Sequence, residues 1–550
     1  MYFISLLSSS RVLLTVCLVA LPPLTLFLFR IGLPVQAKAA TALIAPSLLA
    51  TTGTTYYVAP TGYDVDPGTQ SQPFRTIQKA ADIVNPGDTV IVEAGTYTGS
   101  NSCAGTTAIV CLNRGGSATA KVTFKARSRW GAKLDGQNNS TANGFQFGAV
   151  NYIRIEGFEI YGVGNGGSGG ASGIEVYNGG QGTEIAANNI HDVGRMCTET
   201  GNGQNGIFVQ QPNVLIERNL IHDIGRFVSG ENNCVTTYQA SRDHAIYNSG
   251  TVDGPGIPGG NGTTIKNNIF YNNKRGWSIQ VYPGNVSQLK IYNNTFAFEN
   301  PFQTGHILMG SSGSDNEIKN NIFYDPKTAA LYFYTGTQTS MVVNNNITYG
   351  GVIANKALSG VTFTNNWDNT NPLLFAPLLF DFHLQLGTFP IDSGVTLPEV
   401  TDDFEGVARP QGNGHDIGAY ELSLPTPTPT PTTSPTPSAT PSPSPSPSPP
   451  PNSAPSVSIT SPTDGSTFAG QSNITISANA SDSDGSITRV DFYENGVLIS
   501  TVTSGPFSII WNNVASGNYE LRAKATDNLG AATTSAPVSI TRKRLAKPRH

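Results

Sequence analysis

Short runs of alternating apolar and polar residues fill the middle of the chain. Each run places Ile, Val or Leu at every second position and then reaches an asparagine corner, and it recurs about every 20–30 residues apart from one longer interval after Ile221. An apolar period of two is typical of a β-strand and not of a helix. The copies begin at Glu184, Leu215, Thr264, Lys290, Glu317, Met341 and Val361. A repeat of this length predicts a solenoid, because each unit can bury its apolar side only against its neighbours.

The asparagine pair in the repeat predicts a corner. Asparagine tolerates the left-handed backbone conformation that a tight bend requires. Coils stacked about 4.8 Å apart would also let each asparagine hydrogen-bond to its equivalent in the next coil. A low-complexity Asn-rich tract is the alternative interpretation, but the flanking Ile and Phe residues keep their register from copy to copy.

A second strand precedes the asparagine strand in four of the copies and determines which side chains face outward. Its inward positions would be Ile174, Ile207, Ile246 and Ile279. By alternation, the outer surface would carry Glu175, Phe208, Tyr247 and Gln280, followed two positions later by Tyr177, Gln210, Ser249 and Tyr282.

The ends of such a stack expose strand edges and need covers. Residues 73–84 predict an N-terminal capping helix, because Ile77, Ala80, Ala81 and Val84 fall on one helical face. The first coil would begin at Asp88. We expect residues 382–420 to close the far end.

Composition divides the rest of the chain. Residues 425–453 are almost entirely Pro, Thr and Ser, which predicts an extended polyproline linker after a solenoid domain at 55–422. Residues 454–541 carry short alternating strands, an Asn495-Gly496 hairpin signal and a core candidate in Trp511, which together predict an immunoglobulin-like β-sandwich. A basic tail follows at 542–550.

The N-terminus carries the pattern of an export signal. Arg11 precedes an uncharged apolar run over residues 12–29, and Val35-Gln36-Ala37 offers a cleavage site. The pattern predicts either a cleaved signal peptide over residues 1–37 or a retained signal anchor that tethers the chain to a membrane. Both alternatives place the protein outside the cell, secreted or at the cell surface, where we expect a monomer.

Charge restricts the partners of the chain. Only 13% of its residues are charged, and the formal net charge is −5. Nucleic acid is therefore not an expected partner, because a phosphate-binding face needs an excess of basic residues. A uronic acid polymer would meet the same repulsion, so a site for one must concentrate Lys and Arg locally.

Two regions of the chain resemble known extracellular proteins. Tyr56-Tyr-Val-Ala-Pro-Thr-Gly62 and Pro73-Phe-Arg-Thr-Ile-Gln-Lys-Ala80, together with the asparagine repeats, resemble the pectin-lyase-like superfamily over residues 55–422. Asp482-Ser-Asp-Gly485 and Asp491-Phe-Tyr493 resemble bacterial immunoglobulin-like modules of secreted carbohydrate-active enzymes. The resemblance implies an all-β protein with a right-handed parallel β-helix and a polysaccharide or cell-surface glycan as partner. The superfamily includes lyases, hydrolases, epimerases and non-catalytic binders, so it does not imply one activity.

A uronate lyase needs a base for the proton next to the carboxylate and a cation that stabilises the enolate. Lys274 or His244 is the candidate base, and Arg275 or Arg242 is the candidate partner of the carboxylate. The substrate-binding candidates are Tyr177, Phe208, Tyr247, Gln280 and Tyr282. The alternative is that Lys274-Arg275 is a solvated turn and that His244 makes a hydrogen bond at a corner.

The phrase Ile-His-Asp-x-Gly-Arg occurs at residues 190–195 and again at 221–226, which predicts that His191 stacks beside His222. Cys197 and Cys234 would then leave corresponding corners, and an even number of cysteines in an oxidising compartment favours disulfides. We expect Cys197 to pair with Cys234, and Cys103 to pair with Cys111 across a short loop.

Calcium is the one cofactor that the carboxylates suggest, since it prefers oxygen ligands. Asp192 and Asp223 could hold it, although a repeated turn with Asp–Arg pairing is the alternative. A second acidic cluster comprises Asp402, Asp403, Glu405 and Asp416, which we interpret as structural capping with calcium as the alternative.

The leading hypothesis from the sequence is an extracellular lyase-type eliminase that acts on an acidic polysaccharide. The second hypothesis is a non-catalytic protein that binds glycans or adheres to cell surfaces with the same aromatic groove. The superfamily's hydrolase motifs Gly-His-Gly and Arg-Ile-Lys do not occur in this sequence.

Overall fold

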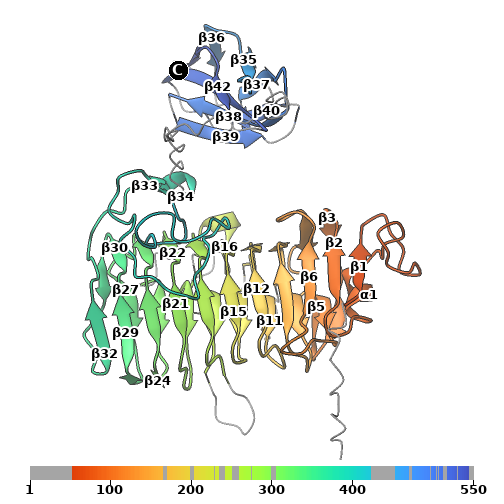
Figure 1. Cartoon of the computed structure of the whole chain (residues 1–550), viewed down its shortest axis with the longest axis vertical. Helices are drawn as coiled ribbons and strands as arrows, with labels where there is room; N and C mark the ends of the chain where they lie inside the picture. Colours follow the sequence, from red (N-terminus) through yellow and green to blue (C-terminus); the bar gives the residue numbers. More distant parts are fainter. Residues whose placement is uncertain are drawn as a thin grey trace, which may run out of the picture. The chain divides into compact units, whose positions relative to one another are not determined.

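The computed structural model describes residues 53–422 and 452–543. Within these ranges it leaves out residues 165–169, 198–202, 228, 235–241, 251–258, 274, 299–304, 470–473, 496, 503–504, 506, 512–513, 515–516 and 529–530. The chain divides into two compact units after Thr428 (Figure 1). The predictions for the signal segment and for most of the linker lie outside the described residues. Among the residues that are described, no helix is both long and apolar enough to span a membrane.

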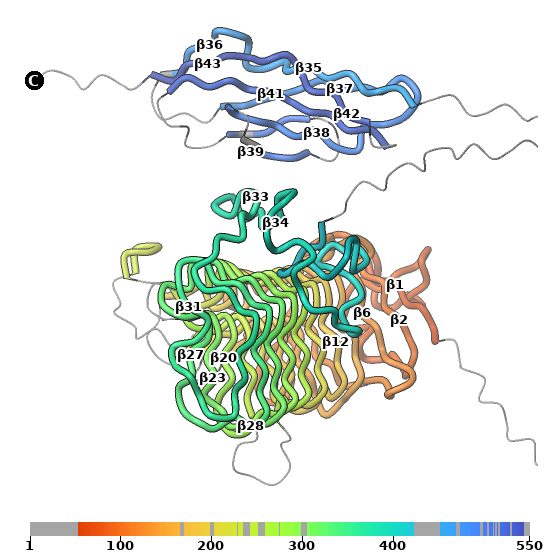
Figure 2. The backbone as a smooth tube through the Cα atoms, turned by 60° about the vertical axis from the view of Figure 1, so that its left-hand side comes forward, coloured from red at the N-terminus to blue at the C-terminus, as the bar shows by residue number. Residues whose placement is uncertain are grey.

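The first unit is a solenoid whose coils contribute to three long sheets, parallel throughout except where β4 pairs antiparallel with β5 (Figures 1 and 2). The 11-stranded sheet comprises, in order, β1 (Thr55–Val58), β2 (Thr89–Val92), β6 (Val122–Ala126), β9 (Ile153–Glu156), β12 (Glu184–Ala186), β15 (Leu215–Glu217), β18 (Thr264–Lys266), β21 (Lys290–Tyr292), β25 (Glu317–Lys319), β29 (Met341–Asn344) and β32 (Val361–Thr364). These strands include the predicted repeat strands.

The 9-stranded sheet follows the next corner of each coil, which carries an asparagine from the β12 coil onward. It comprises β3 (Gly95–Tyr97), β7 (Ala132–Asp135), β10 (Glu159–Tyr161), β13 (Asn189–His191), β16 (Leu220–His222), β19 (Ile269–Tyr271), β22 (Thr295–Ala297), β26 (Ile322–Tyr324) and β30 (Ile347–Tyr349).

The 10-stranded sheet carries the outward side chains that the sequence singled out. It comprises β4 (Asn101–Cys103), β5 (Thr106–Leu112), β8 (Asn143–Phe147), β11 (Ala171–Val176), β14 (Gln204–Val209), β17 (His244–Asn248), β20 (Ile279–Val281), β23 (Ile307–Met309), β27 (Ala329–Phe333) and β31 (Val352–Ala354). A small sheet of β24 (Gly313–Ser314) and β28 (Gln338–Thr339) joins two later coils.

The predicted interior column forms as expected. Ile174 pairs in register with Ile207, Ile207 with Ile246, and Ile246 with Ile279, and all four side chains are fully buried. Residues separated by a whole coil in sequence are therefore direct neighbours, which is the property that builds the surface described below.

At the asparagine corners, two successive residues have different roles: the first makes the bend and the second forms hydrogen bonds between coils. The first residue adopts a left-handed conformation, as at Asn267 (φ 54°) and Asn293 (φ 50°). The second residue is buried and donates its side-chain amide to the side-chain oxygen of the next coil's asparagine at 2.9–3.0 Å. This ladder runs through Asn188, Asn219, Asn268, Asn294, Asn321, Asn346 and Asn366.

A short helix lies at the N-terminal end of the stack. α1 (Ile77–Ala81) buries Ile77, Ala80 and Ala81 against the core, and Val84 after it is also buried. The side chain of Thr76 accepts a hydrogen bond from the Lys79 amide and so starts the helix. Only five of the twelve residues predicted as helix adopt this conformation, because Pro73 and Phe74 join an extended segment beside β1.

The segment after β32, residues 371–422 (the closing segment), does not simply cover the far end. It contains β33 (Leu374–Ala376), a 3₁₀ turn (Pro377–Leu379) and β34 (Asp381–Leu384). Its apolar residues pack on the outer face of the 9-stranded sheet, where they bury Ile269, Ile322 and Ile347. Figure 1 shows this teal segment alongside the coils. The prediction that this segment covers the far end is therefore wrong. It lies along the side of the stack, because the outward apolar residues of these coils are buried there.

The second unit is a β-sandwich. One sheet comprises β35 (Ser456–Ser461), β37 (Ile474–Ser481) and β40 (Ser508–Trp511), and the other comprises β36 (Ser466–Ala469), β43 (Val538–Lys543), β41 (Gly517–Asp527), β38 (Ile487–Glu494) and β39 (Val497–Val502), with β42 (Ala532–Thr534) paired to β41. Val490, Phe492 and Leu521 form its core, and Trp511 packs edge-on to Tyr519. Arg542 and Lys543, which we assigned to the tail, belong to the last strand.

Candidate functional site

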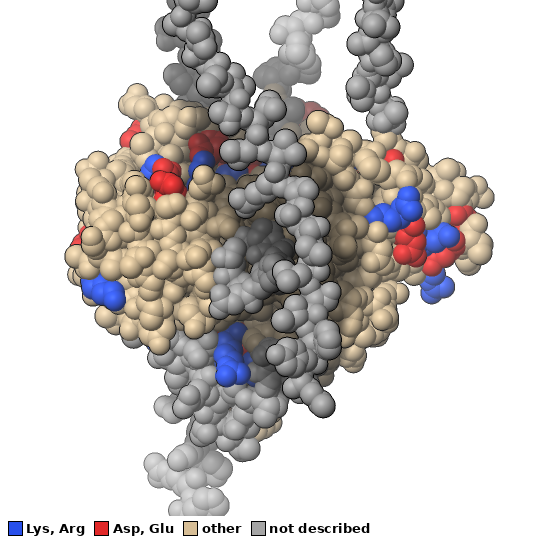
Figure 3. Space-filling model, turned by 90° about the horizontal axis from the view of Figure 1, so that it is seen from below, with Lys and Arg blue, Asp and Glu red and all other residues tan. Residues whose placement is uncertain are grey.

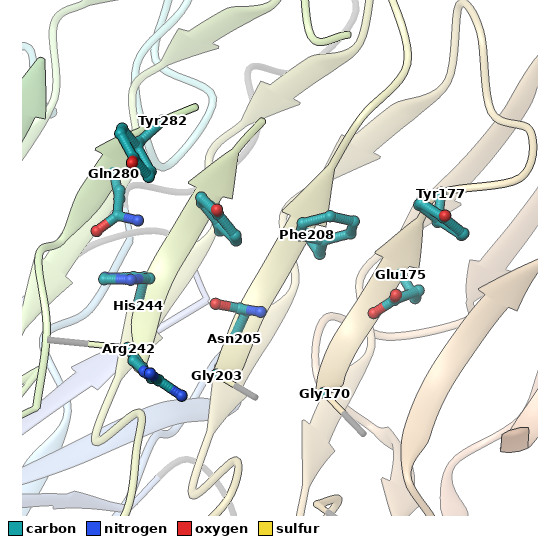
Figure 4. Close-up of a pocket in the computed structure, with 11 residues that line it drawn as sticks. Gly170, Glu175, Tyr177, Gly203, Asn205, Phe208, Arg242, His244, Gln280 and Tyr282 are labelled. Atoms are coloured by element: carbon teal, nitrogen blue, oxygen red, sulfur yellow. The ribbon is translucent and has the colours of Figure 1, made fainter. Parts of the chain in front are cut away.

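A cavity of about 590 Å³ lies on the outer face of the 10-stranded sheet (Figure 4). We call it the groove. Its walls come from the ends and outer faces of β11, β14, β17 and β20. The lining residues are Gly170, Glu175, Tyr177, Gly203, Asn205, Phe208, Arg242, His244, Tyr247, Gln280 and Tyr282.

Strand register explains why these side chains meet. Glu175 pairs with Phe208, Phe208 with Tyr247, and Tyr247 with Gln280, so that one outward column crosses four coils. Asn205 pairs with His244 in a second column. The sequence alternation therefore predicted the first column correctly, and the structure gathers all five predicted substrate-binding residues around one cavity.

The aromatic side chains form a continuous series along the groove. Ring centroids lie 6.1 Å apart between Tyr177 and Phe208 and 5.3 Å apart between Phe208 and Tyr247. Tyr177 and Tyr282 are 37% and 40% exposed, so their rings are accessible to a ligand. Together the rings offer an apolar surface in a cavity that also presents amide and carboxyl groups.

The lone pair of His244 is already engaged in a hydrogen bond, which argues against this residue as a base. Its Nδ1 atom accepts a hydrogen bond from the Trp277 amide at 3.1 Å. Burial lowers the pKa of His244 to about 4, although the charge of Asp243 opposes that shift. The imidazole is therefore neutral near pH 7, with its proton on Nε2 and its one lone pair already engaged. This removes His244 as the proton acceptor that the sequence suggested.

Glu175 is a functional candidate that the sequence analysis did not single out. Burial raises its pKa, while a hydrogen bond from the Ser172 hydroxyl at 2.6 Å to Oε2 opposes the rise. A carboxyl group with a raised pKa can donate a proton near neutral pH. The available signal was a carboxylate in an otherwise uncharged outward column, which was assigned to the surface without a chemical role.

The four residues predicted to be catalytic do not all line the groove. Arg242 lines the groove beside His244 (Figure 4). Arg275 is buried and turns away: its Nε donates to the Arg226 carbonyl at 2.9 Å, and its Nη2 donates to the Phe227 carbonyl. The structure thus places Arg275 behind the groove and not in it. Lys274 lies outside the described residues.

Residues 56–376 match the sequence model described as the Pel9A-like, right-handed β-helix region. That is more than half of the chain. The chain belongs to the Pel9A-like right-handed β-helix family. Residues 455–523 match the bacterial Ig domain. No curated protein is significantly similar to the chain in sequence.

Several solved structures are similar to parts of this Pel9A-like chain. Pectate lyase Pel9A is 15% identical over 68% of this chain and 97% of its own, with a TM-score of 0.44. A rhamnogalacturonan lyase is 14% identical over 66% and 96% of the two chains, with a TM-score of 0.39. The fibronectin(III)-like modules of Clostridium thermocellum CbhA are 29% identical over 17% of this chain and 100% of theirs, with a TM-score of 0.16.

The repeated His-Asp phrase of this Pel9A-like chain forms a stack as predicted. His191 and His222 pair in register, with ring centroids 4.9 Å apart. Each Nδ1 lies 2.8 Å from the following aspartate, Asp192 or Asp223. Burial disfavours the charged form of His191, but its bond to Asp192 outweighs this and raises the pKa of His191. Asp192 and Asp223 therefore each pair with the histidine that precedes them.

Both predicted disulfides form: Cys197 pairs with Cys234, and Cys103 pairs with Cys111.

The acidic cluster of the closing segment holds backbone amides. Asp403 Oδ1 accepts hydrogen bonds from the amides of Glu405, Gly406 and Val407, each at 2.8 Å, and Oδ2 accepts one from Glu421. Asp416 accepts from two further amides. This is the structural capping that we predicted. In the described part of the chain, no three His, Cys, Asp or Glu side chains are arranged to hold a metal ion.

Chelation should leave ligand binding at the groove unchanged. Calcium takes 6–8 oxygen ligands, several of them carboxylates. The described groove residues include one carboxyl group, Glu175, with a raised pKa, so they do not fit this ion. Titration of glycan binding with and without EDTA measures the effect. A loss of affinity that added calcium restores would contradict this expectation.

Proposed function

We propose that this protein is an extracellular polysaccharide-processing protein that holds a sugar chain along the groove. The observation that carries the proposal is the series of aromatic rings Tyr177, Phe208 and Tyr247 in one cavity with Asn205 and Gln280. Binding sites commonly combine apolar and aromatic walls with a few polar groups that orient the ligand. Two disulfides suit an oxidising compartment, and the Pel9A-like family membership supports the same assignment.

The reaction that we propose is a β-elimination on a uronate-containing polysaccharide. A base removes the proton next to the carboxylate, the bond from ring carbon to glycosidic oxygen breaks, and a double bond forms in the sugar. Arg242 would neutralise the carboxylate, and Glu175 would give its proton to the leaving oxygen. Lys274 remains the candidate base.

Elimination is favoured over hydrolysis by the number of carboxyl groups. Glycoside hydrolases generally use a pair of carboxyl groups on either side of the scissile bond. Among the described lining residues, Glu175 carries the one carboxyl group. The nearby Asp243 does not line the groove, since it is buried in an ion pair with Arg226.

A non-catalytic glycan-binding or adhesive protein is the second candidate. The state of His244 favours it, since the imidazole lone pair already accepts the Trp277 amide. One of the two proposed bases is thereby removed, while the aromatic surface is independent of any base.

Incubation with pectate, alginate and glycosaminoglycans separates the two candidates. An eliminase forms products with unsaturated ends that absorb ultraviolet light. Binding without such products would favour the adhesive protein. If the protein neither binds nor cleaves any of these polymers, the proposal is overturned.

Replacing Phe208 by Ala should weaken glycan binding about 5- to 30-fold, because it removes the middle ring of the series, a change of about 1–2 kcal/mol. Isothermal titration calorimetry with a bound oligosaccharide measures the loss. Tyr63→Ala is the matched control, because Tyr63 is an exposed aromatic residue that does not line the groove. Equal losses in both variants would argue against a stacking role for Phe208.

A further inference from the structure

Three charged side chains are buried directly behind the groove. Arg226, Asp243 and Arg275 are only 1–2% exposed. Charges at this depth are costly unless they are paired and hydrogen-bonded. None of the three lines the groove, so their role must be sought in what they hold together.

Asp243 makes contacts with two neighbouring coils. Its Oδ1 accepts from the Gln204 amide at 3.0 Å and from Arg226 Nη2 at 2.7 Å. Its Oδ2 accepts from the Arg226 amide and from Arg226 Nε, both at 3.0 Å. One carboxylate therefore fixes the backbone at Gln204 and at Arg226, and also the guanidinium of Arg226.

Arg275 extends the network to the next coil. Its Nε donates to the Arg226 carbonyl at 2.9 Å. Gln204 begins β14, Asp243 immediately precedes β17, and Arg275 stands four residues before β20. The network therefore joins the starts of the three strands that carry Phe208, Tyr247 and Gln280.

Asp243 also stands between two groove residues in the sequence. Successive side chains of an extended strand point to opposite faces. Arg242 and His244 line the groove (Figure 4). The Asp243 carboxylate instead bonds to the buried Arg226. An anchor on the inner side thus restrains both neighbours on the outer side.

We propose that Asp243, held by Arg226, is a positioning residue: it sets the places of Arg242 and His244 in the groove without touching the ligand. The repeated phrase makes the assignment specific. Arg195, the equivalent of Arg226 one coil earlier, instead pairs with Glu231 at 2.8 Å and lies over the Phe227 ring. The same motif therefore stabilises an outer loop in one coil and the inner side of the groove in the next.

This inference rests on the proposed function for its activity readout, and the variants are chosen to keep the protein folded. Removing one partner leaves a buried charge, whereas replacing both by apolar residues is often neutral for stability. The test variant is therefore Arg226→Met with Asp243→Leu. The matched control is Arg409→Met with Glu421→Leu, a buried pair in the closing segment with an Nη1–Oε2 distance of 2.8 Å.

The test pair should lose about 10-fold or more in glycan affinity or turnover, since small misplacements of binding groups have large effects. Its melting temperature should stay close to that of the control pair. We expect the control pair to bind as the wild type does. Wild-type affinity and turnover in a folded test pair would overturn the inference.

A second readout does not depend on the proposed function. Nitrogen-15 NMR of the seven histidines reports their tautomers, and His244→Gln identifies the His244 signals. Wild-type His244 should show a proton on Nε2 and an accepting Nδ1. In the test pair these signals should move towards those of a free imidazole, and in the control pair they should not. If the His244 signals move in the test pair but the wild type processes no glycan, the positioning role stands and the proposed function is rejected. If the His244 signals do not move, the positioning role is rejected.

Discussion

Replacing Asn188 by Ala should lower the free energy of unfolding of the solenoid by about 2–5 kcal/mol, because it leaves buried polar groups without partners. The Asn188 side chain accepts from the Phe158 amide at 2.9 Å and donates to the Ile155 carbonyl and to Asn219 Oδ1, each at 3.0 Å. Alanine can replace none of these bonds, and the site is fully buried, so water cannot do so either. Denaturant unfolding followed by circular dichroism measures the change.

The neighbouring Asn189, the first residue of β13, provides the control. Its side-chain oxygen has no hydrogen-bond partner, and the residue is only partly buried. Asn189→Ala should therefore cost less than about 1 kcal/mol, as most substitutions away from such networks do. Equal destabilisation by the two substitutions would mean that an asparagine in the ladder contributes no more to stability than an asparagine outside it.

The ladder also shows why the sequence predicted the coils so well. In a solenoid, each residue's environment is set by its equivalent in the adjacent coil, so a repeated pattern implies a repeated contact. Ile174, Ile207, Ile246 and Ile279 could be placed in one column from their spacing alone. The outward aromatic column followed from the same alternation.

The chemistry of the groove was harder to predict because it depends on non-repeating residues. Arg275 was expected in the groove, but the carbonyls of Arg226 and Phe227, in the segment after β16, accept hydrogen bonds from its guanidinium on the inner side. His244 was correctly placed, yet its hydrogen bond to the Trp277 amide determines its protonation, and no spacing in the sequence indicates that bond. The position of the closing segment was also predicted wrongly. It covers outward apolar residues such as Ile322 on the side of the stack, which the repeat pattern did not single out.

Glu175 is expected to have the largest effect on turnover. Glu175→Gln should reduce the rate of product formation about 100- to 1,000-fold, a typical contribution of general acid catalysis. Oligosaccharide affinity should change far less, because the amide keeps the size of the side chain and can still accept a hydrogen bond from the Ser172 hydroxyl. Initial rates and binding isotherms on the same substrate separate the two effects. A variant that keeps the full rate would show that the leaving oxygen receives its proton elsewhere.

The pH dependence of the rate gives an independent test of the same role. A proton donor acts only while it is protonated, so the wild-type rate should fall as pH rises through the raised pKa of Glu175. The residual rate of Glu175→Gln should lack this fall. Ser172→Ala removes a hydrogen bond that favours the ionised carboxylate, so it should raise the pKa of Glu175 further and move the fall to higher pH. A shift to lower pH in Ser172→Ala would contradict the assignment, because the hydroxyl would then be stabilising the protonated acid.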